Sequence, residues 1–272
     1  MPHLKQITFT LLTFLTLSAN IPQTLAQTKP SDWLHEGIIK ANEKNYTEAL
    51  SNFTKAIEIN PQYAEAYYQR GLIYSKYAQG KVPSPDGASP GCQITDKINT
   101  ICEVKTAANW RQQKKQQAIT DFTQAISLKS QYAAAYHQRG LAQETKQDKL
   151  KDFEIANKLY LERSIFNLQN KDYKQAAETL KNIDEIYANI KFISATSSKQ
   201  QEPKNPIGSS TKSPELKKDP EEMMKQANQA LNKGDTQNSL RLYKVVVQIF
   251  QEKKSARVKE VQQIINALEG KK

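Results

Sequence analysis

The stretch INPQYAEAYYQRGL (59–72) recurs with few substitutions as LKSQYAAAYHQRGL (128–141), and this internal match decides the fold. A related segment lies upstream, where Gly37 precedes Gly71 by 34 residues. A fixed period of this length is typical of stacked supersecondary units. Because unrelated amphipathic helices would not reproduce so long a near-identity, we interpret the chain as an array of repeats.

The second half of each unit keeps a fixed spacing of small, aromatic and helix-ending residues. In the first unit, Phe53 follows Ala49 by four residues, and Pro61 comes later. Small residues let two helices approach closely, aromatic residues fill the space between neighbouring hairpins, and proline ends a helix. The residues that we assign to packing within and between repeats are Trp33, Gly37, Ala49, Phe53, Ala56, Pro61, Tyr67, Gly71, Ala118, Phe122, Ala125, Tyr136 and Gly140.

An aromatic residue, a glycine four positions later, and then Ala, Phe, Ala and Pro at fixed offsets resemble the tetratricopeptide repeat (TPR), a helix–turn–helix unit. The resemblance covers about 30–190 and is strongest over 30–72 and 118–141. It implies an all-α, TPR-like α-solenoid of antiparallel helical hairpins. The sequence adds a loop insertion in repeat 2, a C-terminal helical hairpin and a capping helix.

Later units depart from the regular spacing. Between Gly71 and Ala118 the second repeat holds 35 more residues than the first repeat has between the equivalent positions, which predicts an insertion over about 78–112. The end of this insertion has helical character, so we expect it to extend the second helix of the repeat. In the third repeat, the distance from Gly140 to Phe153 is three residues shorter, which predicts a shortened turn between its helices.

A fourth, degenerate unit is indicated by Tyr160, with Ser164 in place of the glycine and Leu180 in place of the phenylalanine. A segment rich in Ser, Pro and Lys follows it without apolar periodicity. The predicted segments are a signal peptide over 1–26, the TPR-like solenoid over 27–192, a flexible linker over 193–220 and a C-terminal TPR-like helical segment over 221–272.

The first 26 residues have the three-part pattern of a secretory signal peptide. Lys5 precedes an uncharged run, ITFTLLTFLTL (7–17), and small residues end at Ala26. The run is short for a membrane span, which needs about 20 residues. We therefore expect an exported protein that starts near Gln27 and is located in the periplasm, an equivalent lumen or the extracellular space; an uncleaved anchor is the alternative.

The only two cysteines, Cys92 and Cys102, lie in the predicted insertion. In an oxidising compartment such a pair most simply forms one disulfide that closes a short loop. A zinc site would need two further ligands, and no histidine lies nearby. We expect this disulfide, no metal site and no cofactor.

The sequence carries no recognisable motif for catalysis, phosphate binding or metal binding, so we expect neither an enzyme nor a small-molecule substrate. Its formal net charge is +11, from 39 Lys and Arg against 28 Asp and Glu. Because the two signs are interleaved, they indicate solvated helix faces and favour no nucleic-acid partner. An anionic envelope surface is an alternative partner for this charge.

The remaining candidate site is the concave face, which the first helix of each repeat lines in this family. The resemblance implies that a bound partner faces Leu34, Ile38, Asn42, Tyr68, Leu72, Lys76, His137, Leu141 and Thr145. Tyr68 and His137 occupy the same slot in consecutive units, and each combines a flat ring with a hydrogen-bonding atom. The chaperone-tail clamp of this family places Lys and Asn where Leu34 and Ile38 stand here, so we expect no recognition of a free carboxylate tail.

The predicted function is thus a non-catalytic scaffold or adaptor that binds a protein or peptide partner of unknown identity in the concave groove, outside the cytoplasm. Two alternatives stay open. One is an enzyme or cell-wall accessory protein whose site lies in the disulfide-closed insertion, and the other is a membrane-anchored assembly factor.

Overall fold

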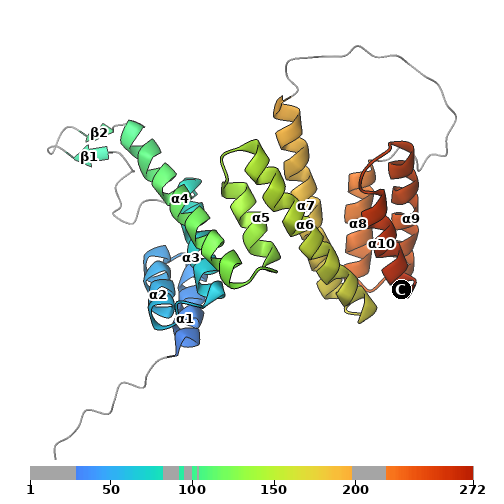
Figure 1. Ribbon diagram of the computed structural model, residues 1–272, viewed down its shortest axis with the longest axis horizontal. Helices are drawn as coiled ribbons and strands as arrows, with labels where there is room; N and C mark the ends of the chain where they lie inside the picture. The colour runs from blue at the N-terminus through green and yellow to red at the C-terminus, as the bar shows by residue number, and fades with distance from the viewer. Residues whose placement is uncertain (1–28, 82–91, 95–99, 103, 198–218, 272) are drawn as a thin grey trace, which may run out of the picture.

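The computed structural model describes residues 29–81, 92–94, 100–102, 104–197 and 219–271, which form ten α-helices and one two-stranded ribbon. The elements in chain order are α1 (Pro30–Asn42), α2 (Tyr46–Ile59), α3 (Ala64–Ala78), β1 (Cys92–Ile94), β2 (Thr100–Cys102), α4 (Val104–Leu128), α5 (Ala133–Ala142), α6 (Lys146–Gln169), α7 (Tyr173–Ser197), α8 (Pro220–Asn232), α9 (Thr236–Glu252) and α10 (Val258–Leu268). Figure 1 shows the helices as a row that runs from α1 and α2 at one end to α8–α10 at the other. Each helix packs on its neighbours in the chain, which confirms the predicted all-α, TPR-like solenoid.

The small residue of the first helix and the aromatic residue of the second helix interlock in each regular hairpin. A Cβ atom added to Gly71 would lie 2.8 Å from Cε1 of Phe122, and one added to Gly140 would lie 2.8 Å from Cε1 of Phe153. Both phenylalanines are buried. Since Cβ atoms essentially never approach that closely, only glycine permits this separation of the helices.

In the fourth hairpin a different pair of residues occupies these two positions. Ser164 and Leu180, which replace the glycine and the phenylalanine, are both buried. The larger first residue is matched by a smaller second one, so the two departures from the repeat pattern compensate each other in volume.

Three of the inter-helix turns share one backbone conformation and one capping hydrogen bond. Lys44, Lys171 and Gly234 adopt positive φ angles of 63°, 59° and 80° after α1, α6 and α8. The next residue is an Asn or Asp whose side chain accepts a hydrogen bond from the third residue after it, as Asp235 does from the amide of Asn238 at 3.1 Å. This left-handed residue followed by an N-cap ends one helix and begins the next.

The third hairpin corrects a prediction. Its turn, 143–145, is as long as the turn 43–45 of the first hairpin, so the expectation of a shortened turn is wrong. The three residues are missing from the first helix of the hairpin, because α5 has 10 residues where α1 has 13. Thr145 is the N-cap of α6 and accepts a hydrogen bond from the amide of Asp148 at 3.0 Å.

The fourth unit is fused to the third. α6 continues for 24 residues from the second helix of repeat 3 into the first helix of the fourth unit. Pro61 lies in the turn that separates α2 from α3, whereas the equivalent part of α6 contains no proline. The absence of proline permits one continuous rod but does not by itself produce it, since the turn between α4 and α5 has Ser130 at the same position.

The insertion in repeat 2 lies partly within the described residues. α4 is 25 residues long against 14 for α2, so the second helix of the repeat is extended at its start. Ahead of it, β1 and β2 pair antiparallel with Cys92 opposite Cys102. The side chains of both cysteines, and with them the predicted disulfide, lie outside the described part of the structure.

Other boundaries shift slightly. α7 runs through Ser197 and α8 begins at Pro220, so both ends of the predicted linker 193–220 are helical. Residues 198–218 of that linker and the predicted signal peptide lie outside the described residues. None of the helices that the structure describes is both long and apolar enough to cross a membrane.

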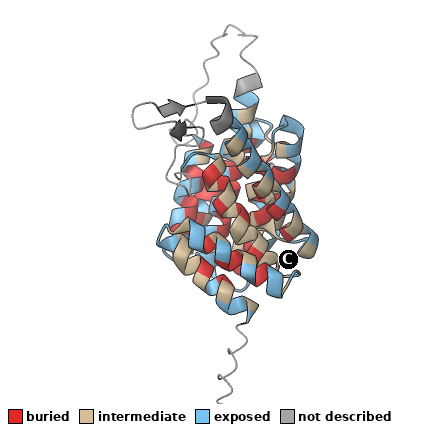
Figure 2. Cartoon of the chain, turned by 90° about the vertical axis from the view of Figure 1, so that its left-hand side faces the viewer, coloured by how far each residue is buried: buried red, intermediate tan, exposed pale blue. Residues whose placement is uncertain are grey.

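Figure 2, a view along the row of helices, shows buried residues towards the middle and exposed residues towards the outside. One hydrophobic core, around Phe53, is formed by α1, α2 and α3. The largest core, around Leu180 and Tyr243, is formed by the end of α6 together with α7, α8, α9 and α10. The C-terminal segment therefore packs directly against the solenoid, and α10 covers its last hairpin.

Candidate functional site: the aromatic row and its cleft

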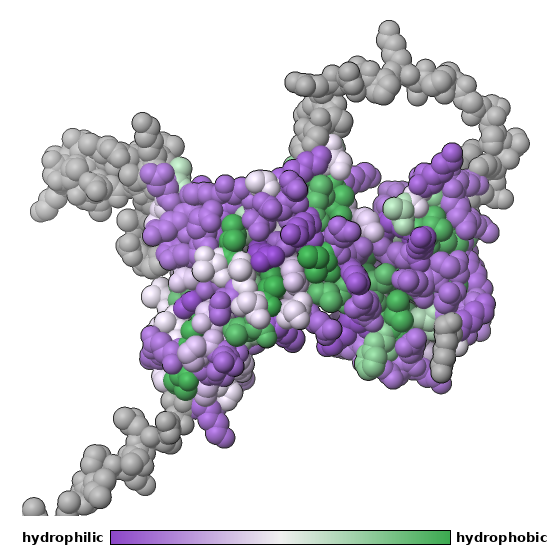
Figure 3. All heavy atoms as spheres, viewed as in Figure 1, coloured by the Kyte–Doolittle hydropathy of each residue, from purple (hydrophilic) through white to green (hydrophobic). Residues whose placement is uncertain are grey.

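The predicted groove residues differ in their accessibility. Leu34 and His137 are buried, with exposed fractions of 8% and 3%. The half-buried residues are Ile38, Tyr68, Leu72 and Lys76, and the exposed ones are Asn42, Leu141 and Thr145. Figure 3 shows apolar residues over the middle of the molecule as separate patches between polar ones.

His137 belongs to the interior. Its ring stands edge-on to Phe153 at a centroid distance of 5.9 Å and to Tyr160 at 6.2 Å. Burial lowers the pKa of His137 to about 4, so the ring is neutral at physiological pH. The structure therefore corrects the prediction that His137 lines the groove: its ring packs against Phe153 and Tyr160 in the interior.

The structure also corrects the predicted position of Thr145. Its predicted place on the first helix of repeat 3 assumed a helix of full length, but α5 ends at Ala142. As an N-cap, its hydroxyl is engaged by the first turn of α6.

Tyr68 is joined by two tyrosines that sequence reasoning did not place in the groove. The rings of Tyr68 and Tyr132 are tilted against each other at a centroid distance of 4.8 Å. The Tyr132 hydroxyl donates a hydrogen bond to Glu65 on α3. We call Tyr68 on α3, Tyr132 directly before α5, and Tyr160 on α6 the aromatic row.

The hydroxyls of the aromatic row stay protonated. Burial raises the pKa of Tyr68 to about 12, with a further contribution from Glu65. Burial also raises the pKa of Tyr132 and Tyr160. Neutral hydroxyls can donate and accept hydrogen bonds, which suits a polar backbone laid against the rings.

A cleft of about 450 Å³ opens beside the row, between the start of α5 and the helices α6 and α7. Its lining includes Lys129, Tyr132, Tyr160, Arg163, Gln175 and Thr179. We call this space the Tyr132 cleft. Its walls combine flat rings, amide and hydroxyl groups and two cationic side chains, which can hold an extended peptide segment.

The sequence also carried a signal for ion pairs within the hairpins that the repeat pattern alone did not reveal. Both QRGL segments place arginine directly before glycine, and Asp precedes Phe at the partner position of the second helix. The structure pairs them: Arg70 contacts Asp121, and Arg139 contacts Asp152. A search for complementary charges at fixed repeat positions would have found these pairs.

A second cleft, of about 460 Å³, lies between α7 and α8. Its walls include Ala177, Lys181, Asp184, Lys225 and Asn228. No tyrosine ring or arginine lines it, and at its base Asn228 donates a hydrogen bond to Asp184 at 2.7 Å. This hydrogen bond joins α8 to α7 at the base of the cleft.

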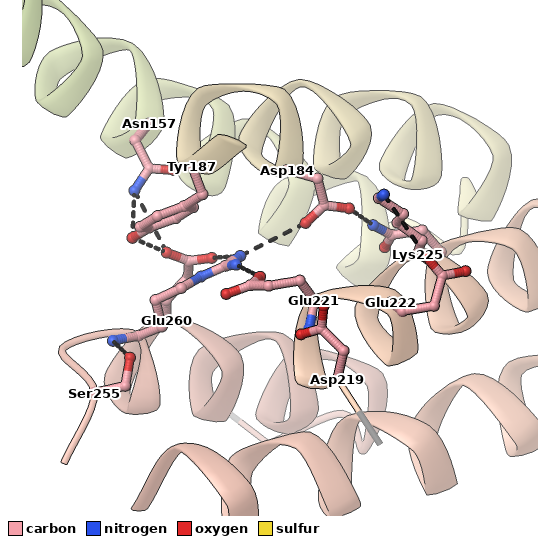
Figure 4. A network of polar contacts seen from close by, with 11 residues as sticks. Asn157, Asp184, Tyr187, Asp219, Glu221, Glu222, Lys225, Ser255 and Glu260 are labelled. Atoms are coloured by element: carbon pink, nitrogen blue, oxygen red, sulfur yellow. Dashed lines mark hydrogen bonds and ion pairs between the residues drawn. The ribbon is translucent and has the colours of Figure 1, made fainter. Parts of the chain in front are cut away.

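The base of that cleft continues into the buried polar network of Figure 4. Arg257 is 4% exposed and contacts three carboxylates: Glu221, Glu260 at 3.0 Å and Asp184 at 3.6 Å. Its guanidinium also lies 3.7 Å from the ring centroid of Tyr187. The network links the C-terminal segment to α7, and we interpret it as the element that holds the segment in place.

Within the described ranges, no group of three or more His, Cys, Asp and Glu side chains could hold a metal ion. The side chains gathered in the Tyr132 cleft are suited to binding by contact and hydrogen bonding.

Comparison with known proteins agrees with this architecture. Residues 41–80 match the profile of the TPR repeat family, so the chain contains at least one repeat of this kind within an all-α solenoid. No curated protein is significantly similar to the chain.

Solved structures that match the chain include the first TPR of Spaghetti (RPAP3) bound to the HSP90 peptide SRMEEVD. It is 19% identical, and the alignment covers 62% of this chain and 94% of that one, with a TM-score of 0.35. Yeast Tom70 is 10% identical over 89% of this chain and 75% of that one, with a TM-score of 0.18. Similarity of this extent says nothing about the partner of the present chain.

Proposed function

We propose that the protein is a non-catalytic scaffold that holds a peptide segment of a partner protein against the aromatic row. The observation that carries the proposal is a group of three tyrosines from consecutive repeats: Tyr68 packs on Tyr132, and Tyr132 and Tyr160 line one cleft of about 450 Å³. Aromatic rings supply a large contact area at a low cost in side-chain entropy.

The accessible predicted residues extend this surface. Tyr68 and Leu72 share one face of α3, and Leu141 is exposed at the end of α5. Leu34, by contrast, is buried in the core around Phe53, where no peptide tail can reach it. The position that carries lysine in the chaperone-tail clamp is thus occupied here by a core residue, which supports a partner of a different kind.

Affinity purification with quantitative mass spectrometry tests the proposal. The double variant Tyr68→Ala, Tyr160→Ala should recover at least tenfold less of the partner, because truncating central aromatic residues of an interface typically costs more than 1.4 kcal/mol. Tyr173→Ala, a half-buried tyrosine outside the row, is the matched control. Equal recovery by both variants, at unchanged helicity, would contradict the proposal.

Export is part of the proposal and is supported by the signal-like pattern of 1–26. Cys92 and Cys102 are directly opposite each other on the two strands of the ribbon, which favours a disulfide between them. An oxidising compartment outside the cytoplasm would allow that disulfide to form. Intact-mass measurement of the protein from its native source should give a chain that starts near Gln27 and lacks two hydrogens. A chain that starts at Met1 with two free thiols would refute both points.

A further inference from the structure

One position of the repeat carries arginine in three consecutive units. Arg70, Arg139 and Arg163 each stand immediately before the small residue that faces the second helix. The first two are neutralised within their own hairpins. Arg70 donates two hydrogen bonds of 2.8 Å to Asp121, and Arg139 donates two of 2.9 and 2.7 Å to Asp152.

The third arginine has lost this partner. At the position of Asp121 and Asp152, the fourth hairpin carries Thr179, whose hydroxyl donates to the carbonyl of Gln175 at 2.7 Å. Arg163 is exposed and makes no ion pair with any residue that the structure describes. A guanidinium that is matched by a carboxylate in two repeats is therefore unmatched in the next.

Arg163 and Thr179 both line the Tyr132 cleft. The other charged residues of its lining are Lys129 and Glu162, so the lining has a net charge of one positive unit. The Tyr160 hydroxyl adds a neutral hydrogen-bonding group, whereas the Tyr132 hydroxyl already donates to Glu65. The cleft thus offers a fork of N–H donors beside aromatic rings, an arrangement that suits a planar carboxylate.

We infer that the Tyr132 cleft anchors an acidic side chain of the bound partner, with an aspartate or glutamate carboxylate set against Arg163. This carboxylate takes the role that Asp121 and Asp152 have in the two preceding repeats. The inference rests on the proposed function, because it specifies one residue of the peptide held on the aromatic row.

The repeat itself supplies a sharp test. Thr179→Asp restores the carboxylate found at this position in the preceding hairpins, so the variant should neutralise Arg163 internally and close the anchor. Thr179→Asn has nearly the same shape without the charge and is the matched control. Both variants should keep the helicity of the parent chain, and Arg241→Ala, an exposed arginine of α9, controls for the loss of one positive charge.

The probe is a phage-displayed library of random dodecapeptides, selected on the full chain. Peptides are displayed through their C-terminal ends and are then synthesised as C-terminal amides, so that the only carboxylates come from side chains. Fluorescence anisotropy measures their dissociation constants with the parent chain and with each variant.

We expect the selected peptides to share an Asp or Glu at one position. Replacing it by Asn or Gln should weaken binding about tenfold, as expected for one charge-assisted pair at a partly exposed site. Thr179→Asp and Arg163→Ala should abolish this difference between acidic and amide peptides, whereas Thr179→Asn and Arg241→Ala should preserve it.

Two outcomes would overturn the inference, and they are distinguishable. Selected peptides without a shared acidic position, or an acid-to-amide difference that survives Thr179→Asp, would refute the anchor alone when Tyr68→Ala still abolishes binding. Failure to select any peptide would refute the proposed groove, and the anchor with it.

Discussion

Arg139 donates two parallel hydrogen bonds to Asp152. Its Nη1 donates a third, of 3.2 Å, to Thr123 on α4, the second helix of the hairpin before it. Arg70 repeats the arrangement, since it pairs with Asp121 and donates to Thr54 at 3.3 Å. Each arginine therefore joins the two helices of its own hairpin and the second helix of the hairpin before it. These pairs, together with the glycine–phenylalanine contacts, set the spacing of the solenoid.

Removing the carboxylate of such a pair should destabilise the fold. Asp121→Ala leaves the largely buried Arg70 without its counter-charge, and we expect the free energy of unfolding to fall by about 2–4 kcal/mol. Glu48→Ala, at the exposed contact with Lys40, should leave the urea midpoint unchanged. Urea denaturation followed by circular dichroism measures both, and equal midpoints would show that the buried pair is dispensable.

The close contact of Gly71 with Phe122 predicts a rescue. Gly71→Ala places a methyl group against a buried ring and should cost about 1–2 kcal/mol after the gain in helix propensity is deducted. Phe122→Leu alone should cost a similar amount, because it leaves a void. The double variant, which mimics the Ser164–Leu180 solution of the fourth hairpin, should lose clearly less than the sum. Additive losses in a double-mutant cycle would contradict the proposed compensation.

Asp184 predicts a pH dependence in the acidic range. Burial raises its pKa from 3.8 to about 6, against the opposing effects of Arg257 and Asn228, while Glu221 and Glu260 act in the same direction as burial. The folded state therefore favours the protonated carboxyl, and this contribution is present below pH 4 and is lost as the pH rises to 6. Asp184→Asn should gain about 2 kcal/mol relative to the parent chain across that window. Thermal midpoints of both proteins between pH 4 and 7 check this, and parallel curves would refute it.

His137 should act in the opposite sense. Its folded pKa of about 4 lies below the ordinary value of 6.5, so its contribution is present above pH 6.5 and is lost as the pH falls towards 4. Its buried Nε2 has no hydrogen-bond partner among the residues that the structure describes. His137→Phe keeps a ring between Phe153 and Tyr160 and removes the titration, so it should unfold at a higher urea concentration than the parent below pH 6. A constant difference between pH 4 and 8 would argue against burial of the neutral ring.

The sequence allowed the hairpins and their packing residues to be predicted, because the repeat places Gly37, Gly71 and Gly140 in one register. The position of the three-residue deletion could not be predicted. A shorter turn and a shorter helix give the same spacing between Gly140 and Phe153, and the N-cap of Thr145 decides in favour of the shorter helix.

The interior of the site was less accessible to sequence reasoning. His137 and Tyr68 share a repeat position, yet the neighbours Phe153 and Tyr160 enclose the histidine, whereas Tyr68 packs against Tyr132 and stays half-buried. Arg257 pairs with Glu221 and Asp184, which lie 36 and 73 positions away along the chain, and no local sequence pattern predicts such pairs.

Site-specific photo-cross-linking tests the central claim most directly. A p-benzoylphenylalanine at Tyr160 would face the Tyr132 cleft, and the same probe at Lys151, an exposed residue nine positions earlier, would point to the opposite side of α6. In cells of the native source, irradiation should give a partner adduct from position 160 and none from position 151. An adduct from position 151 alone would mean that the aromatic row is not the binding surface.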